Sequence, residues 1–249
     1  MRISEYVNKE HRLTKMDPRV KVLLAVAVLV MVLSHRGFTF HGAVSLSALL
    51  LCWGMKIPWK IVSLRLIEPL FIVLVIILLK CFFSGNDPLF TLPLPGITIT
   101  GYGDGLREGL AIGSRIISAI LVVSVLVFST PFTQLMAALS WLRVPKGFIE
   151  IASYAYRYIF VLLDDAGVIY SAQKNRLGYS SLRRGFKSFG VLTGSLIIKA
   201  FDHSQNVTVA MVQRGYDGNI PLLKQKPFRM GEVIFSLLFI TAMGIAWKI

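Results

Sequence analysis

The chain has 249 residues, of which 55% are hydrophobic and 16% are charged, and its formal net charge is +14. Soluble domains carry about 25% charged residues, so this composition excludes an ordinary soluble protein and predicts one that crosses the lipid bilayer several times. The basic residues lie between apolar segments, where they set membrane topology, and nucleic acid is therefore not an expected partner.

Five apolar segments are long enough to predict membrane-spanning helices. No removable signal peptide is expected ahead of them, because the polar N-terminus lacks a short apolar core with a cleavage site. Asp17-Pro18 predicts the start of the first helix, since aspartate caps free N–H groups and proline suits the first turn. The expected fold is an all-α membrane protein with spans at about residues 20–33, 38–55, 66–83, 110–128 and 231–247.

The loop between the third and fourth spans reads "SGNDPLFTLPLPGITITGYGDG". Short β-prone runs flank a Pro-Gly turn in it, which predicts a small hairpin. This hairpin is expected to cover the outer face of the helix bundle.

The basic residues predict the orientation of the chain. The N-terminal segment, the loop between the second and third spans, and residues 130–230 are rich in Lys and Arg, whereas the other two connections hold only Arg36 and Arg107. Five spans place every basic segment on one side, which should be cytoplasmic. We therefore expect a multi-pass protein of the inner (plasma) membrane with its N-terminus in the cytoplasm and its C-terminus outside.

Residues 148–163 are apolar enough to suggest a sixth span. Arg157 lies in the middle of this stretch, and Asp164 and Asp165 follow it, which argues against contact with lipid. A sixth span would also place part of the basic segment outside. The stretch is expected to be a helix partly buried against other helices.

Three parts of the chain follow from this reading. Residues 1–129 hold the first four spans, residues 130–230 form a cytoplasmic region, and residues 231–249 form the last span. The cytoplasmic region should begin with a short helix in "PFTQLMAALSWL" that ends near Pro145. A long helix towards Arg176 should follow, then the connection "GYSSLRRGFKSFG", then a helix over about residues 192–214.

The last of these helices is predicted to be amphipathic. Its expected apolar face comprises Ile197, Ala200, Phe201, Ser204, Val207 and Met211. Its polar residues, which should point elsewhere, are Lys199, Asp202, Gln205 and Gln213.

The two long cytoplasmic helices end in similar ways. The first reads "AQKNRLGY" with Ala172, Arg176 and Gly178, and the second reads "AMVQRGYDG" with Ala210, Arg214 and Gly215. Taken singly, each is explained as a helix stop, because a C-terminus favours a cation and glycine allows a left-handed cap.

The repetition of this ending favours a docking role. The small side chain of the alanine one turn before each arginine lets another protein approach that face of the helix closely. The planar guanidinium can then bind a carboxylate through paired hydrogen bonds. Two such ends suit a partner with two equivalent acidic grooves, as a symmetric dimer has.

Several motifs resemble one family, the transmembrane T components of energy-coupling-factor (ECF) transporters. "HRLTKMDPRVK" resembles the family's entry motif, "TPFTQLMAAL" and the two arginine ends resemble later parts of it, and the similarity covers nearly the whole chain. "AMVQRGY" followed by "DG" resembles the cobalt and nickel branch, the CbiQ/NikQ-like proteins.

The resemblance implies a partner and a substrate subunit. T components combine membrane helices with long cytoplasmic coupling helices, and two short Ala-Arg-Gly-like motifs dock into grooves of two ABC-type ATPase subunits. By position, the docking arginines would be Arg176 and Arg214. The triplets here read Asn175-Arg176-Leu177 and Gln213-Arg214-Gly215, so both keep the arginine, neither has the family's alanine before it, and only the second has the glycine after it.

Motifs for catalysis and for cofactors are missing from the sequence. It has no P-loop and no Gly-Lys pair, so the chain is not expected to bind ATP itself. Its histidines, His11, His35, His41 and His203, show no metal-ligand spacing. We therefore expect no catalytic residue, no cofactor and no metal site, and a transported metal should bind another subunit. Asp164 and Asp165 are interpreted as salt-bridge partners.

Three charged residues lie inside predicted spans, namely Glu68, Lys80 and Arg115. Charges there are costly and often functional, although each lies near enough to a helix end for its side chain to reach water. Arg115 is the candidate for contact with a substrate-specific membrane subunit.

The leading hypothesis is a non-enzymatic coupling subunit of an ATP-driven importer for cobalt or nickel. An autonomous secondary transporter would show inverted repeats and broken helices at the membrane midplane, and neither is visible. A polytopic membrane enzyme would need clustered Asp, His or Cys at the ends of spans, which this sequence lacks.

Overall fold

The computed structural model describes residue 14 and residues 16–35, 37–85, 88–94, 97–216 and 230–248, with only the backbone described for 88–94, 97–100 and 248. Its contacts divide the chain into two compact units. Unit 1 comprises residues 1–138 and 225–249, and unit 2 comprises residues 139–224. Each unit is described by itself below.

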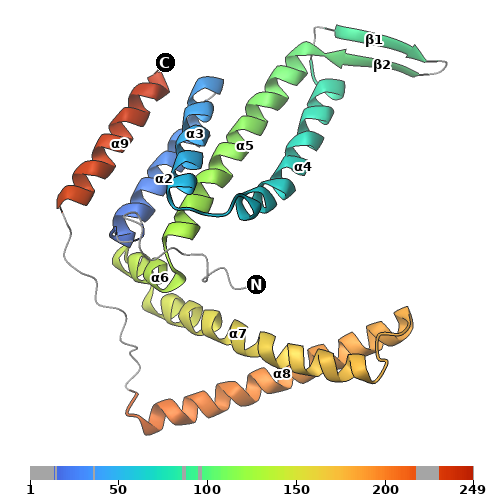
Figure 1. The fold of residues 1–249 in the computed structure, drawn as a ribbon, viewed down its shortest axis with the longest axis vertical. Coiled ribbons are helices and arrows are strands. Elements are labelled where there is room, and N and C mark those ends of the chain that lie inside the picture. The colour runs from blue at the N-terminus through green and yellow to red at the C-terminus, as the bar shows by residue number, and fades with distance from the viewer. Residues whose placement is uncertain are drawn as a thin grey trace. The chain divides into compact units, whose positions relative to one another are not determined.

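Unit 1 is a bundle of apolar helices (Figure 1). The helix α5 contacts α2, α3 and α4, and α9 contacts α2 and α3. These helices are α2 (Pro18–Ser34), α3 (Phe38–Gly54), α4 (Trp59–Phe83), α5 (Gly103–Ser129) and α9 (Met230–Lys248). The predicted start of α2 is confirmed, because the Asp17 side chain accepts a hydrogen bond from the Arg19 amide at 3.0 Å.

The core of unit 1 consists of two apolar clusters. One joins α2, α3, α5 and α9 around Val32, Phe40 and Val44, all of which are almost fully buried. The other joins α3, α4 and α5 around Leu121 and Phe128. Side chains on the outer surface of α4, such as Phe71, remain exposed, as expected for a helix that faces lipid.

A row of glycines lets α5 approach α4 closely. Gly105, Gly109 and Gly113 recur every four residues along α5, and a Cβ on Gly105 would lie 2.0 Å from the carbonyl oxygens of Lys80 and Ser84. Small residues at this spacing are typical of helix packing in membranes, where close backbone contact replaces the hydrophobic effect.

The hairpin predicted between the third and fourth spans is confirmed. β1 (Pro88–Leu94) pairs antiparallel with β2 (Ile97–Tyr102), and the register places Leu94 opposite Ile97. It connects α4 to α5 (Figure 1).

The protein is an all-α membrane protein apart from this hairpin. Among the described residues, three helices are long and apolar enough to cross a membrane, namely α4, α5 and the Met230–Trp247 part of α9. The helices α2 and α3 have 17 residues each, which is the lower end of the range of about 17–25 residues for a span. All five predicted segments are therefore helical, and α4 and α5 each begin seven residues earlier than expected.

The short helix predicted after the fourth span is also present. α6 (Phe132–Trp141) follows Thr130-Pro131. After it come the two long helices α7 (Lys146–Asn175) and α8 (Leu182–Gln213). Residues 148–163 belong to α7, which is not among the helices that qualify as membrane spans.

The helix α8 begins ten residues earlier than its sequence predicts. Most of the connection "GYSSLRRGFKSFG" is helical, because the Ser181 hydroxyl caps the helix by accepting a hydrogen bond from the Arg184 amide. Serine and glycine in this stretch suggested a loop, but one serine at the N-cap position is enough to start the helix.

Candidate functional site

The two helices that carry the arginine ends pair with each other within unit 2. α8 runs back along α7 after a short turn, so that the C-terminal ends of the two helices lie at opposite ends of the pair (Figure 1). α8 has 32 residues, and at 1.5 Å per residue it is about 48 Å long. Arg176 and Arg214 are therefore separated by roughly the length of this helix.

Arg176 is the C-cap residue of α7 and lies within a hydrogen-bonded helix stop. Its amide donates to the Ala172 carbonyl at 3.3 Å. Beyond it, the Leu177 amide donates to the Lys174 carbonyl at 3.0 Å, and the Gly178 amide donates to the Gln173 carbonyl at 2.9 Å. This pair of bonds is a Schellman motif, which satisfies carbonyls that the helix end would leave free.

Arg214 ends α8 in the same motif. Its amide donates to the Ala210 carbonyl at 3.2 Å. The Gly215 amide donates to the Val212 carbonyl at 3.0 Å, and the Tyr216 amide donates to the Met211 carbonyl at 3.0 Å. Each bond has its counterpart at Arg176 at the same spacing, so the two arginines project from equivalent positions of two equivalent helix ends.

The left-handed residue differs between the two ends. Gly215, with φ of 78°, takes this conformation as predicted, but at the first end Leu177 takes it, with φ of 57°. Gly178 has another role there, because a Cβ on it would lie 2.6 Å from the Ser188 Oγ and 2.9 Å from the Gln173 carbonyl oxygen. The glycine of the first end is therefore needed for close packing one position after the left-handed residue.

Side-chain hydrogen bonds between α7, the turn and α8 hold the first end in place. The Ser188 hydroxyl donates to the Gly178 carbonyl at 2.9 Å, and the Gln173 side-chain amide donates to the Ser188 carbonyl at 3.0 Å. The Tyr179 hydroxyl donates to the Gln173 side-chain oxygen at 2.7 Å, and its ring lies 4.9 Å from that of Tyr170. Ser188 gave no signal in the sequence, because its role depends on where α8 crosses the turn.

Both arginine side chains are exposed, and so are Ala172 and Ala210 one turn before them. Among the described residues, no carboxylate forms a salt bridge with either arginine. Each end thus presents an exposed guanidinium group with hydrogen-bond donors suited to a carboxylate. The helix surface one turn before it carries only the methyl group of an alanine.

A salt bridge joins α7 to α8 away from the arginine ends. Lys199 Nζ lies 2.7 Å from Asp165 Oδ1, and His203 Nε2 lies 3.3 Å from Asp165 Oδ2. The hydrogen bond from Lys199, together with that from His203, holds the pKa of Asp165 below its usual value of 3.8. The expectation of a salt bridge is confirmed for Asp165, whereas Asp164 is exposed.

This salt bridge corrects the predicted faces of α8. Lys199 was expected to point away from the apolar face, yet it pairs with Asp165 of α7 and lies on the same side of α8 as Val207 and Met211, which are half-buried. Ile197 and Phe201 were expected on the buried side and are 66% and 64% exposed. The helix is rotated relative to the expectation because Asp165 offers Lys199 a partner, which the pattern within α8 does not reveal.

Arg115 lies in unit 1, on α5. Its guanidinium donates to the His35 carbonyl at 2.9 Å, at the C-terminal end of α2 where carbonyls lack partners within the helix. Lys80 pairs with Glu108 at 2.9 Å between α4 and α5. These two basic side chains thus have partners within unit 1, and neither belongs to the α7–α8 pair.

The histidines do not form a metal centre in the described part of the chain, which contains no group of three or more His, Cys, Asp or Glu that could hold a metal ion. The rings of His35 and His41 lie 5.9 Å apart. Both ring nitrogens of His41 face carbonyl oxygens, those of Gly37 at 2.6 Å and Val32 at 3.1 Å. His41 is therefore engaged in holding the turn between α2 and α3.

Comparisons with known proteins agree on one family. Residues 9–225 match the family model CbiQ, described as cobalt transport protein. An uncharacterised protein of Methanocaldococcus jannaschii is 29% identical over 223 residues, which cover 89% of this chain and 83% of that protein.

Two named relatives come from bacteria. The energy-coupling factor transporter transmembrane protein EcfT of Staphylococcus aureus is 27% identical, over 82% of this chain and 80% of its own length. The cobalt transport protein CbiQ of Salmonella typhimurium is 29% identical, over 69% of this chain and 77% of its own length.

Proposed function

The chain belongs to the CbiQ family of cobalt transport proteins, and from this premise we propose that it is the transmembrane coupling (T) component of an energy-coupling-factor importer. Its partners are a dimer of ABC-type ATPases in the cytoplasm and a substrate-specific membrane subunit. The relatives named CbiQ and EcfT support this assignment. The substrate is cobalt or nickel, and it binds the other membrane subunit. The chain itself is non-catalytic.

The observation that carries the proposal is the pair of matching helix ends. Arg176 and Arg214 close two Schellman motifs with the same bonds, are exposed, and lie about the length of α8 apart. A structural helix stop needs no arginine at this position and no second copy. Two copies suit two equivalent sockets on a dimer.

Each arginine is suited to an acidic socket. Its guanidinium carries two parallel N–H groups that match a carboxylate, and such bidentate pairs are among the strongest hydrogen bonds in proteins. The small, exposed side chains of Ala172 and Ala210 allow a groove of the ATPase to fit closely around each helix end. The Schellman bonds leave few free carbonyls near the arginine that would repel the carboxylate.

The α7–α8 pair transmits movement between the sockets. The helices are joined by the contact of Asp165 with Lys199 and His203 and by the hydrogen-bonded turn at Gly178. When ATP binding and hydrolysis move the two ATPase subunits, the helix ends follow them. The bundle of unit 1 then reorients the substrate-specific subunit.

The test replaces the arginines by glutamate. Arg176→Glu and Arg214→Glu should each weaken co-purification of the ATPase dimer, and the double variant should abolish it together with uptake of radiolabelled cobalt, because like charges repel in the acidic sockets. The amount of the chain in the membrane should stay unchanged. The matched control is Arg183→Glu, an exposed arginine of the first turn of α8, which should leave both readouts unaffected. A double variant that still yields an intact, transport-active complex would contradict the proposal.

A further inference from the structure

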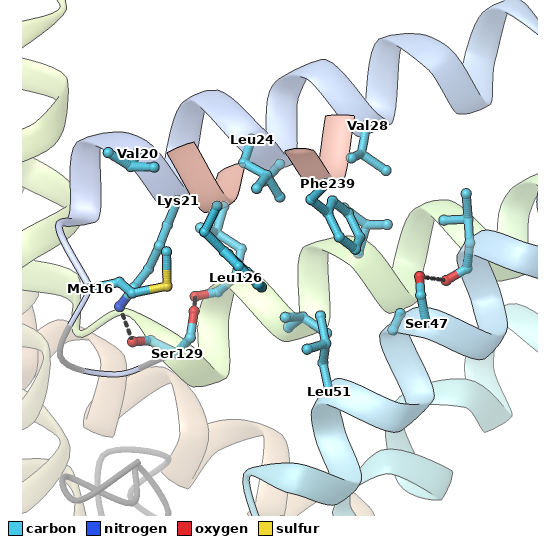
Figure 2. Close-up of a pocket in the computed structure, with 16 residues that line it drawn as sticks. Met16, Val20, Lys21, Leu24, Val28, Ser47, Leu51, Leu126, Ser129 and Phe239 are labelled. Atoms are coloured by element: carbon cyan, nitrogen blue, oxygen red, sulfur yellow. Dashed lines mark hydrogen bonds between the residues drawn. The ribbon is translucent and has the colours of Figure 1, made fainter. Parts of the chain in front are cut away.

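Unit 1 contains a partly open cavity of about 120 Å³ between the four helices α2, α3, α5 and α9. Its wall includes Leu24 and Val28 from α2, Leu51 from α3, Leu126 from α5 and Phe239 from α9 (Figure 2). The coupling function proposed above assigns no role to this cavity.

The cavity has one charged end. Lys21 lines it and is only 8% exposed, and its ammonium donates to the Ser129 carbonyl at 2.9 Å and the Thr14 carbonyl at 3.2 Å. Met16, Lys21 and Ser129 lie together at this end, and Phe239 lies farther along the cavity (Figure 2). An ammonium has three N–H donors, and the described residues account for two of them.

The rest of the lining offers few groups that could bind a polar ligand. Ser47 and Ser129 are its other polar side chains, and their hydroxyls already donate within their own helices, to the carbonyls of Val44 at 2.8 Å and Leu126 at 3.2 Å. Away from Lys21 the lining therefore does not favour water, because a buried water needs two to four polar partners.

The dimensions of the cavity favour a hydrocarbon chain over a polypeptide helix as its occupant. A helix with its side chains is about 10–12 Å wide, far more than a cavity of 120 Å³ admits. From Lys21 to Val28 the cavity follows α2 for seven residues, or roughly 10 Å. A single hydrocarbon chain fits this shape, with its polar end at Lys21.

Charges of both signs surround the polar end. The carboxylates of Glu232 and Asp17 lie close enough to act electrostatically on the Lys21 ammonium, and the Asp17 amide donates to Glu232 Oε2 at 2.7 Å. A purely anionic headgroup would meet these carboxylates as well as the lysine. A zwitterionic headgroup can present its phosphate to Lys21 and its ammonium to the carboxylates.

We propose that this cavity binds one acyl chain of a zwitterionic phospholipid whose phosphate accepts a hydrogen bond from Lys21 and whose ammonium faces Glu232 and Asp17. The lipid fills the space between α2, α3, α5 and α9 and so ties α9 to the bundle. The proposal is independent of ATPase docking, and neither Arg176 nor Arg214 takes part in it.

The test is photo-crosslinking of the full chain in vesicles of equal parts phosphatidylethanolamine and phosphatidylglycerol. In one arm the phosphatidylethanolamine carries a diazirine in its acyl chain, and in the other the phosphatidylglycerol carries it. Crosslinked residues are mapped by mass spectrometry. We expect Leu24, Leu51, Leu126 and Phe239 to be labelled several-fold more in the first arm than in the second.

Two variants on α3 provide a matched pair. Leu51→Trp fills the cavity and should reduce labelling of Leu24 and Leu126 at least fivefold. Leu50→Trp makes the same change at the next residue, which does not line the cavity and is 54% exposed, and labelling should be retained. Equal expression and extraction of the two variants show that both fold.

A third variant tests the polar end. Lys21→Met should remove the preference for phosphatidylethanolamine over phosphatidylglycerol, and Lys21→Arg should restore it. Equal labelling of the cavity in both arms with the unaltered chain would overturn the proposal. Absence of label from the cavity would also overturn it, including the case in which the N-terminal segment of the chain occupies the site.

Discussion

Leu177 and Gly215 occupy the same position after the two arginines, and both have positive φ. Leucine in this conformation is strained by roughly 1–2 kcal/mol, and the strain persists because Gly178, Ser188 and Gln173 hold the turn from both sides. The first helix end is thus kept in its shape by contacts with α8, whereas the second relies on the freedom of glycine.

A substitution at Gly178 tests whether close packing against α8 holds the first helix end in its shape. Gly178→Ala should destabilise the first end by about 1–3 kcal/mol, because the new Cβ would meet the Ser188 Oγ and the Gln173 carbonyl. Hydrogen exchange of the amides in the last turn of α7 should then accelerate about fivefold or more.

The control for Gly178 is a glycine of α8 with free space around it. Gly194→Ala adds a Cβ that has nothing within 4 Å, and alanine favours a helix interior over glycine by roughly 0.5–1 kcal/mol. Exchange within α8 should therefore slow in this variant. If Gly178→Ala slowed exchange as well, the packing role of Gly178 would be refuted.

At the scale of elements, the α7–α8 pair has few buried apolar contacts, since α8 has no buried residue and α7 has Ile149 alone. Asp165 contacts both Lys199 and His203 of α8. A pair of amphipathic helices with so little buried surface depends on such specific polar contacts for its crossing geometry.

The lowered pKa of Asp165 predicts how this crossing responds to acid. Because the carboxylate is favoured in the paired state, its contribution is present above the usual pKa of 3.8 and is lost as the pH falls through the lower folded-state pKa. The distance between nitroxide labels at Val168→Cys and Gln205→Cys should be measured by pulsed electron paramagnetic resonance with Cys52 and Cys81 replaced. Its distribution should be narrow near neutral pH and should broaden only below pH 3.8, as Asp165 becomes protonated.

Asp165→Asn should show the broad distribution at every pH. The neighbouring Asp164→Asn should behave as the unaltered protein does, because Asp164 is exposed. An unchanged distribution in Asp165→Asn would show that other contacts set the crossing.

At the scale of the whole molecule, the distribution of basic residues predicts how the chain lies in the membrane. The regions before α2, between α3 and α4, and from α6 to α9 are basic, and such regions remain in the cytoplasm. The turn between α7 and α8 should therefore be cytoplasmic, and the junction of β2 with α5 should lie outside.

Cysteine labelling in intact cells checks this orientation. In a chain without its native cysteines, a membrane-impermeant maleimide should label Asp104→Cys directly and should label Ser180→Cys only after the membrane is permeabilised. Both positions are exposed in the structure, so access across the membrane decides the result. Direct labelling of Ser180→Cys would contradict five spans with a cytoplasmic N-terminus.

The amino-acid pattern was enough to predict the class of protein, the positions of its apolar helices, the hairpin and the two helix ends at Arg176 and Arg214. These features depend on local patterns, such as runs of apolar residues, Asp17-Pro18 and the Pro-Gly turn, and local patterns act through neighbours along the chain. Arg176 and Arg214 were found in this way because a helix end is a local structure with its own residue preferences.

Which side of a helix packs against its neighbour became visible only in the folded chain. The inward position of Lys199, the left-handed Leu177 held by Ser188, and the cavity beside Lys21 all depend on partners far away in the sequence. An opposite charge or a carbonyl from a second helix outweighs the apolar pattern of the first, because a polar group that is buried without a partner costs more than a methyl group that stays exposed.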